Sequence, residues 1–140
     1  APAADAFSGR VRALGGRAMR LKVNGAFHTP WMRPATAELS AALTSVEMTA
    51  PDMPVYANRT GLPYPGPDKR LLADQISSPV RFEDTIRNML RDGFDTFVET
   101  GPGRVLSGLI QKIDASARVL RVSEAADVEK ITEELSHGDR

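Results

Sequence analysis

Histidine is the side chain best suited to acid–base chemistry near neutral pH, and this chain contains two histidines. His137 lies three residues from the end of the sequence, where a solvated tail is the ordinary interpretation. His28 lies within Gly25–Pro30, after a segment with strand-like alternation and before a predicted helix. Loops that leave the carboxyl ends of strands carry many reactive groups in α/β proteins. Position alone leaves two interpretations of His28, a general base or a histidine hydrogen-bonded within a turn.

A general base needs a group to activate, and the sequence offers no recognisable nucleophile. There are no cysteines, which excludes thiolate chemistry and cysteine-ligated metals. A serine nucleophile in an α/β protein lies in a Gly-x-Ser-x-Gly elbow, and none of the nine serines does so. Ser8 and Ser107 are interpreted as structural. A histidine placed for general-base work, without its nucleophile, is the central problem that the sequence poses.

Cofactor and metal sites find little support. Gly101-Pro102-Gly103 follows a predicted strand and opens a predicted helix, as a phosphate-binding loop would. However, Leu106 occupies the position of the third glycine, and no Gly-Lys-Ser/Thr ending follows, so a tight turn is favoured. Two histidines so far apart give no metal-ligand spacing. We therefore expect neither a metal nor a cofactor.

The composition is that of one ordinary globular domain. The 140 residues include 18 Lys and Arg against 18 Asp and Glu, so the formal net charge is zero. Neutral balance without a basic patch argues against nucleic acid or an anionic membrane as partner. No apolar run is long enough to span a bilayer and no signal-peptide pattern opens the chain, so we expect a cytoplasmic protein. The chain begins at Ala1 rather than Met, as a processed product or an excised piece would.

Helical and extended patterns alternate along the chain, which predicts an α/β fold with mainly parallel strands. Helices are expected where apolar residues recur at helical spacing, and strands where they alternate or form short runs. The helices are expected at 2–14, after Pro34, at 68–76, from Phe82 to the stop at Gly93, after Gly103, and near the C-terminus; the strands at 17–23, 55–57, 94–99 and 118–122. The segment 61–67 holds two glycines and three prolines and is expected to be a surface loop.

Three motifs in order resemble a known family: Gly25–Met32, Asp74–Phe82 and Glu99–Leu106. Together with Asn58–Gly61 they look like malonyl-CoA:acyl carrier protein transacylase, the acyltransferase of fatty-acid synthesis, and its polyketide-synthase relatives. The resemblance implies an α/β-hydrolase-like large subdomain with a small ferredoxin-like insert. Residues 1–23 would end the small subdomain, and residues 24–140 would form the C-terminal part of the large one.

The resemblance also implies a reaction and its partners. Family members transfer a malonyl group from coenzyme A to a serine, and then to the thiol of acyl carrier protein. The elbow serine, the oxyanion-hole residue and the carboxylate-binding arginine of the family are absent here. The chain is therefore expected to supply the histidine half of the site, to need the missing N-terminal half, and to be inactive alone.

The family pattern assigns roles to four residues of this sequence. His28 matches the catalytic histidine, which takes the serine proton and returns it to the leaving thiol. Gln75 matches the position whose main-chain carbonyl orients that imidazole. Phe27 resembles the bulky residue of malonyl-selective members, where methylmalonyl-selective relatives commonly carry serine, and Asn58 is assigned to substrate binding. For Phe27 the alternative is core packing under the loop.

Two other functions stay open at this stage. A non-catalytic interaction domain could keep the fold and lose the chemistry, although such a domain would have no need of His28. A hydrolase could use the same base, but its site would have to admit water and lack the carboxylate-binding arginine.

Overall fold

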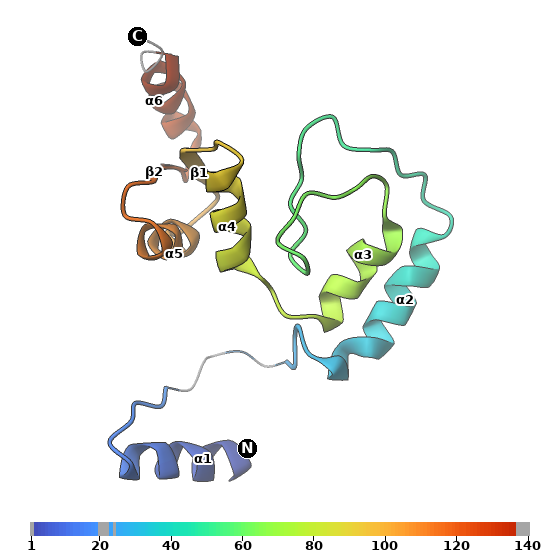
Figure 1. Cartoon of the computed structure of the whole chain (residues 1–140), viewed down its shortest axis with the longest axis vertical. Coiled ribbons are helices and arrows are strands. Elements are labelled where there is room, and N and C mark those ends of the chain that lie inside the picture. The colour runs from blue at the N-terminus through green and yellow to red at the C-terminus, as the bar shows by residue number, and fades with distance from the viewer. Residues whose placement is uncertain (1, 20–22, 24, 137–140) are drawn as a thin grey trace.

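The chain folds into two groups of elements that are joined near Ser78–Arg81 (Figure 1). The structure is a computed structural model and describes residues 2–19, 23 and 25–136. The first group holds the turn η1 (Pro30–Met32), α2 (Arg33–Leu43), α3 (Lys69–Asp74) and the turn η2 (Gln75–Ser77); the second holds α4 (Phe82–Arg91), β1 (Thr96–Thr100), α5 (Val105–Ile113), β2 (Arg118–Val122) and α6 (Ala125–Ser136).

In the first group, α2 packs against α3 and against η2. Pro34 stands in the first turn of α2, where a proline costs no hydrogen bond. The Asp68 carboxylate caps α3 by accepting the Leu71 N–H at 2.8 Å. The predicted helix at 68–76 is therefore present, but its last turn tightens into η2, which places the Gln75 carbonyl at a helix end.

The second group is a β-α-β unit with two further helices. Strands β1 and β2 pair in parallel, with Thr96 opposite Arg118, and α5 makes the connection between them. The small core beneath them is built on Ile86, Ile110 and Ala117, with Phe82 and Met89 packed against it. The sheet among the described residues is parallel, and the α/β fold class is confirmed.

Glu99 on β1 fixes the start of α5. Its carboxylate accepts the N–H of Leu106 at 3.0 Å and that of Ser107 at 2.9 Å, and it also accepts the Ser107 hydroxyl. These hydrogen bonds favour the ionised carboxylate, with the Ser107 hydroxyl as the largest cause, and lower the pKa of Glu99. The Gly101–Gly103 segment is thus the turn before a capped helix.

The loop between α2 and α3 is tied to α4. The Asn88 side chain donates to the Gly61 carbonyl at 2.6 Å, and the Tyr56 hydroxyl donates to Asp92. Gly61 has a φ of 70°, and a Cβ there would lie 3.0 Å from the Cβ of Asp84. Glycine is required at this close approach. The predicted loop at 61–67 is confirmed.

Two predicted strands are not formed. Residues 17–19 and 23 have no regular structure, and the rest of the predicted strand at 17–23 lies outside the described residues. In the segment 55–57, only Tyr56 pairs, in an isolated antiparallel bridge with Pro63. A strand exists only where a neighbour satisfies its backbone groups, and β1 and β2 pair with each other instead. Both predictions were wrong for the described residues because they were based on side-chain types and took no account of a pairing strand.

The chain exposes more surface than its mass requires. Its accessible area is 10,824 Å², whereas a compact monomer of 15.2 kDa exposes about 7,100 Å². Helix α1 (Pro2–Ala13) forms as predicted but contacts no other described helix or strand, and its Phe7 is 68% exposed. None of the helices among the described residues has the length and apolarity needed to cross a membrane.

Candidate functional site

His28 occupies a backbone conformation that few non-glycine residues adopt. Its φ is 61°, the single positive φ outside glycine among the described residues. One hydrogen bond within the turn and one to a distant part of the chain stabilise it. Thr29 donates its hydroxyl to the Ala26 carbonyl at 2.7 Å, and the His28 N–H donates to the Ile76 carbonyl at 3.0 Å. Such strained residues persist where the surroundings hold them, and they cluster at active sites.

The His28 imidazole is oriented by a main-chain carbonyl. Its Nδ1 atom lies 3.0 Å from the Gln75 carbonyl oxygen. Because a carbonyl can only accept, Nδ1 must carry the proton in this contact, and Nε2 of the neutral ring is then left with its lone pair. No described residue hydrogen-bonds Nε2, and the side chain is exposed. The arrangement provides a base with a fixed tautomer and an open acceptor atom.

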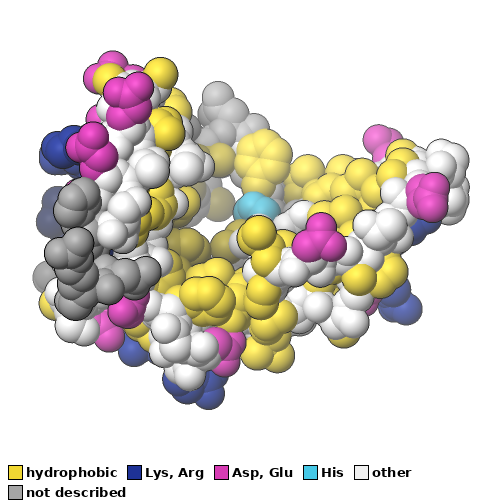
Figure 2. All heavy atoms as spheres, turned by 90° about the horizontal axis from the view of Figure 1, so that it is seen from above, with side chains coloured by type: hydrophobic (Ala, Val, Ile, Leu, Met, Phe, Trp, Pro, Cys, Tyr) yellow, Lys and Arg dark blue, Asp and Glu magenta, His cyan; other side chains and the backbone are white. Residues whose placement is uncertain are grey.

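Figure 2 shows a face of the molecule with an open hollow, bordered by hydrophobic side chains and by a histidine side chain in cyan. His28 is exposed, so a second molecule or segment can reach its Nε2 atom.

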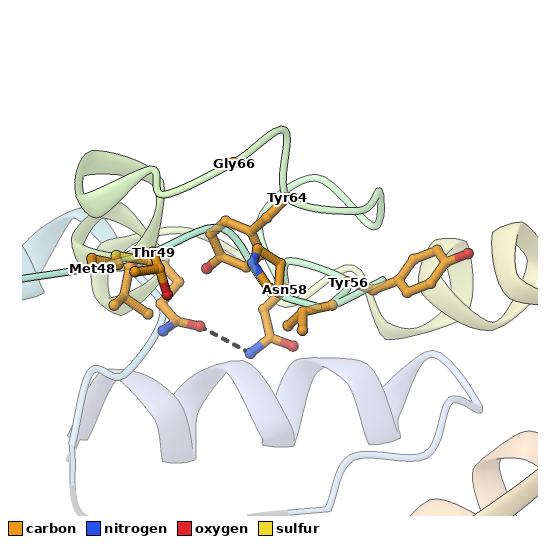
Figure 3. A pocket seen from close by; sticks show the side chains of 10 residues that line it. Met48, Thr49, Tyr56, Asn58, Tyr64 and Gly66 are labelled. Carbon is orange, nitrogen blue, oxygen red and sulfur yellow. Dashed lines mark hydrogen bonds between the residues drawn. The ribbon is translucent and has the colours of Figure 1, made fainter. Parts of the chain in front are cut away.

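Gln75 acts on His28 through its backbone, and its side chain has a separate partner. The Gln75 Oε1 atom accepts a hydrogen bond from Nδ2 of Asn58 at 3.0 Å (Figure 3). Arg59, which follows Asn58, forms an ion pair with Asp74, which precedes Gln75. On the other side of the same turn, the Thr36 hydroxyl donates to Ser77 at 3.0 Å. From the sequence, the Gln75 side chain is expected to be an ordinary polar group. The sequence does not reveal these three contacts, because each joins residues 15 or more positions apart.

A mostly apolar pocket of about 330 Å³ lies beside this contact. Asn58 and Gln75 line one wall of it, and Val55, Tyr64 and Leu72 contribute others (Figure 3). His28 does not line the pocket. The structure therefore brings Gln75 to both His28 and Asn58, while Asn58 faces the pocket rather than the imidazole.

Phe27 precedes His28 and is 58% exposed, so it belongs to no core among the described residues. Its ring lies over Gly25: a Cβ on Gly25 would come within 2.5 Å of the Phe27 ring. The missing side chain of Gly25 is what makes room for the ring. Phe27 thus directly precedes His28 in the chain and presents much of its ring to solvent.

Neither a metal site nor a nucleophile is found beside His28. Among residues 2–19, 23 and 25–136, no group of three or more histidine, cysteine or acidic side chains could hold a metal ion. The hydroxyl groups of Ser77 and Ser107 are engaged by Thr36 and Glu99. The site as it stands can accept and return a proton, and it needs a reacting group from elsewhere.

Comparisons with known proteins give relatives of one kind. No family model matches the chain. It is 36% identical over 115 residues to the malonyl CoA-acyl carrier protein transacylase of Bacillus subtilis, covering 81% of this chain and 36% of that protein. It is 37% identical over 107 residues to the mitochondrial malonyl-CoA-acyl carrier protein transacylase of Homo sapiens, covering 72% of this chain and 27% of that protein. The chain spans about a third of the length of these relatives.

Solved structures agree. The malonyl CoA-acyl carrier protein transacylase from Clostridium perfringens matches 95% of this chain with a TM-score of 0.85 and 32% identity, over 43% of its own length. A second match, with a TM-score of 0.84 and 28% identity over 95% of this chain and 44% of the other, is a type II polyketide acyl-carrier protein in complex with its malonyl-transacylase.

Proposed function

This chain belongs to the malonyl-CoA:acyl carrier protein transacylase family, as a counterpart of its C-terminal part, and we propose that it supplies the general base of such an acyltransferase. The substrates would be malonyl-CoA and acyl carrier protein. The nucleophilic serine would come from the N-terminal half of the site. Residues 1–23 would belong to the small subdomain and residues 24–140 to the large one.

The observation that carries the proposal is the contact between Nδ1 of His28 and the Gln75 carbonyl, at 3.0 Å. It supports a proton on Nδ1, which leaves the lone pair of the neutral ring on Nε2, the form that a general base requires. A histidine that only stabilised a turn would not need an exposed ring nitrogen without a partner among the described residues.

The proposed reaction has two balanced steps. In the first, Nε2 of His28 takes the serine proton as the serine oxygen bonds the malonyl carbonyl carbon. The carbon–sulfur bond of malonyl-CoA then breaks, and the imidazolium returns the proton to the departing thiolate. In the second, Nε2 takes the proton of the carrier-protein thiol, whose sulfur attacks the acyl-serine and releases the serine with that proton. The Gln75 carbonyl stabilises the imidazolium each time.

The exposed area supports the need for a second half. The chain exposes about 3,700 Å² more total surface than a compact protein of its mass, and apolar side chains border the hollow in Figure 2. Contiguous exposed apolar surface is typical of a face that another protein segment covers. We propose that the nucleophile-bearing half covers this face. A cytoplasmic location belongs to the same proposal, although the human relative is named as mitochondrial.

A non-catalytic interaction domain is the second candidate, favoured by the lack of a Gly-x-Ser-x-Gly elbow in the 140 residues. Incubation with malonyl-CoA followed by intact-mass measurement separates the two. We expect no malonyl adduct on this chain alone, and an adduct on the serine-bearing half when the two are mixed, which acyl carrier protein then removes. Complex formation without acylation would support the interaction domain, and an adduct on this chain alone would contradict the split site.

A further inference from the structure

We propose that Asn58 is a positioning residue that orients His28 by holding the Gln75 peptide, with Arg59 as its neighbour in the same clamp. The inference rests on the proposed function, in which the Gln75 carbonyl sets the tautomer of the base. It changes the role expected for Asn58, from a substrate-binding residue to one that acts through another residue.

Two consecutive residues of the loop grip two consecutive residues at the end of α3. Asn58 Nδ2 donates to Gln75 Oε1 at 3.0 Å (Figure 3). Arg59 forms an ion pair with Asp74. The gripping segment is itself anchored, since the Asn58 carbonyl accepts the Arg81 N–H at 2.8 Å, just before α4 begins. The clamp therefore connects the turn at Gln75 to the second group of elements.

The orientation of the Gln75 carbonyl decides how well it serves two donors. It accepts Nδ1 of His28 at 3.0 Å and, more weakly, the Ser78 N–H at 3.4 Å. A carbonyl oxygen has two lone pairs and can serve both donors, but a carbonyl at a helix end can also tilt in favour of one of them. A small rotation of this peptide would strengthen the Ser78 bond and release the imidazole. Anchoring the Gln75 side chain opposes that rotation.

The clamp would affect the acylation rate by keeping the proton of His28 on Nδ1. While the carbonyl accepts from Nδ1, the proton stays there and Nε2 remains the base. When the carbonyl tilts away, the proton can move to Nε2, and that fraction of molecules cannot accept the serine proton. Loss of the Asn58 contact should therefore lower the rate of acylation without changing the binding of malonyl-CoA.

The tautomer of His28 distinguishes the proposed role of Asn58 from a merely structural one, because loss of a structural contact would not change which nitrogen is protonated. This chain, with nitrogen-15 in its histidines, is combined with the unlabelled serine-bearing half, so that two labelled imidazoles are observed, and a His137→Gln variant assigns them. In the wild type, long-range proton–nitrogen spectra should show His28 protonated on Nδ1. In Asn58→Leu, which keeps the side-chain size, they should show a mixture of the two tautomers.

The matched control is Thr36→Val, which removes a hydrogen bond from the other side of the same turn and leaves the Asn58–Gln75 contact in place. It should leave the tautomer unchanged. If Asn58→Leu fails to fold, Asn58→Ser, whose hydroxyl is too short to reach Gln75, takes its place. An unchanged tautomer in a folded Asn58 variant, or an equal shift in Thr36→Val, would overturn the clamp.

The kinetic counterpart uses the chain combined with the serine-bearing half. Asn58→Leu should reduce single-turnover acylation by about 3- to 10-fold, the range that one hydrogen bond provides, with the Kd for malonyl-CoA unchanged. A tautomer shift in Asn58→Leu together with full activity in His28→Ala would retain the clamp and contradict the proposed function. Loss of activity in His28→Ala with no tautomer shift in Asn58→Leu would retain the proposed function and contradict the clamp.

Discussion

The Nδ1 atom of His28 lies 3.0 Å from the carbonyl oxygen of Gln75, which is 47 residues further along the chain. An acidic side chain often orients a catalytic histidine, but here a neutral main-chain acceptor stands in that place. Its position depends on how α3 ends in a tightened turn and, in the proposed clamp, on the anchored Gln75 side chain. The imidazole is therefore oriented by a main-chain carbonyl, and variants at His28 and Asn58 test what that orientation does.

Replacing His28 with alanine should reduce the single-turnover rate of malonyl transfer to serine by roughly 10²–10⁴, the usual contribution of a positioned base. The assay combines the variant with the serine-bearing half and follows acylation by rapid quench. His137→Ala, the other histidine of the chain, is the matched control and should keep the wild-type rate. Equal rates for His28→Ala and wild type would return His28 to a structural role.

Phe27→Ser should raise the ratio of kcat/KM for methylmalonyl-CoA to that for malonyl-CoA. The phenyl ring is 58% exposed on the residue that precedes His28, and under the proposed function we expect it to meet a methyl branch on the acyl group. A hydroxymethyl group leaves room for that branch, and steric exclusion can discriminate by more than the ~1–3 kcal/mol gained from one added methyl.

Competition between the two thioesters measures that ratio directly. Phe7→Ser, which changes an exposed phenylalanine of α1 remote from the site, serves as its control. An unchanged ratio in Phe27→Ser would show that Phe27 does not gate the acyl group.

In the complex with the serine-bearing half, Glu99→Gln should lower the melting temperature at neutral pH, and this difference should shrink as the pH falls below the unfolded-state pKa of Glu99. The pKa of Glu99 is lowered in the folded state by its bonds to Ser107 and Leu106. A lowered folded-state pKa means that its contribution to stability is present above the unfolded-state pKa and is lost as the pH falls through the folded-state pKa.

Thermal melts of that complex, with wild type or variant, from about pH 7 into the acid range follow this loss. Glu38→Gln, at an exposed glutamate on α2, is the control for removing one carboxylate without removing the contact to α5. A melting difference between wild type and Glu99→Gln that stays constant across this range would refute the proposed ionised cap.

The isolated chain should associate or aggregate at micromolar concentration. It exposes about 3,700 Å² beyond a compact monomer, and both strands of its two-stranded sheet have a free edge. Light scattering should report species larger than a monomer, and the serine-bearing half should convert them to a single 1:1 complex. A monodisperse monomer with a cooperative melt would count against an uncovered face.

Several elements could be predicted from the local pattern of apolar residues, because they are stabilised by contacts within the element or along a single apolar face. Phe82, Ile86 and Met89 recur at helical spacing, and they pack on the core side of α4 as expected. The run 118–122 forms β2 within its predicted bounds, because the β-α-β unit supplies its partner. The segment 55–57 has an equally strand-like composition but only an isolated bridge, since no described strand lies beside it.

The sequence by itself determined the α/β class, the helices and the identity of His28 as the candidate base, because side-chain type and spacing are local properties. Only the tertiary structure decided what His28 touches. Its turn, the end of α3 and the loop at Asn58 come from three separate parts of the chain, and their hydrogen bonds exist only when folding brings those parts together. Periodicity encodes which face of an element is apolar, whereas which carbonyl tilts toward which ring depends on packing across the whole site.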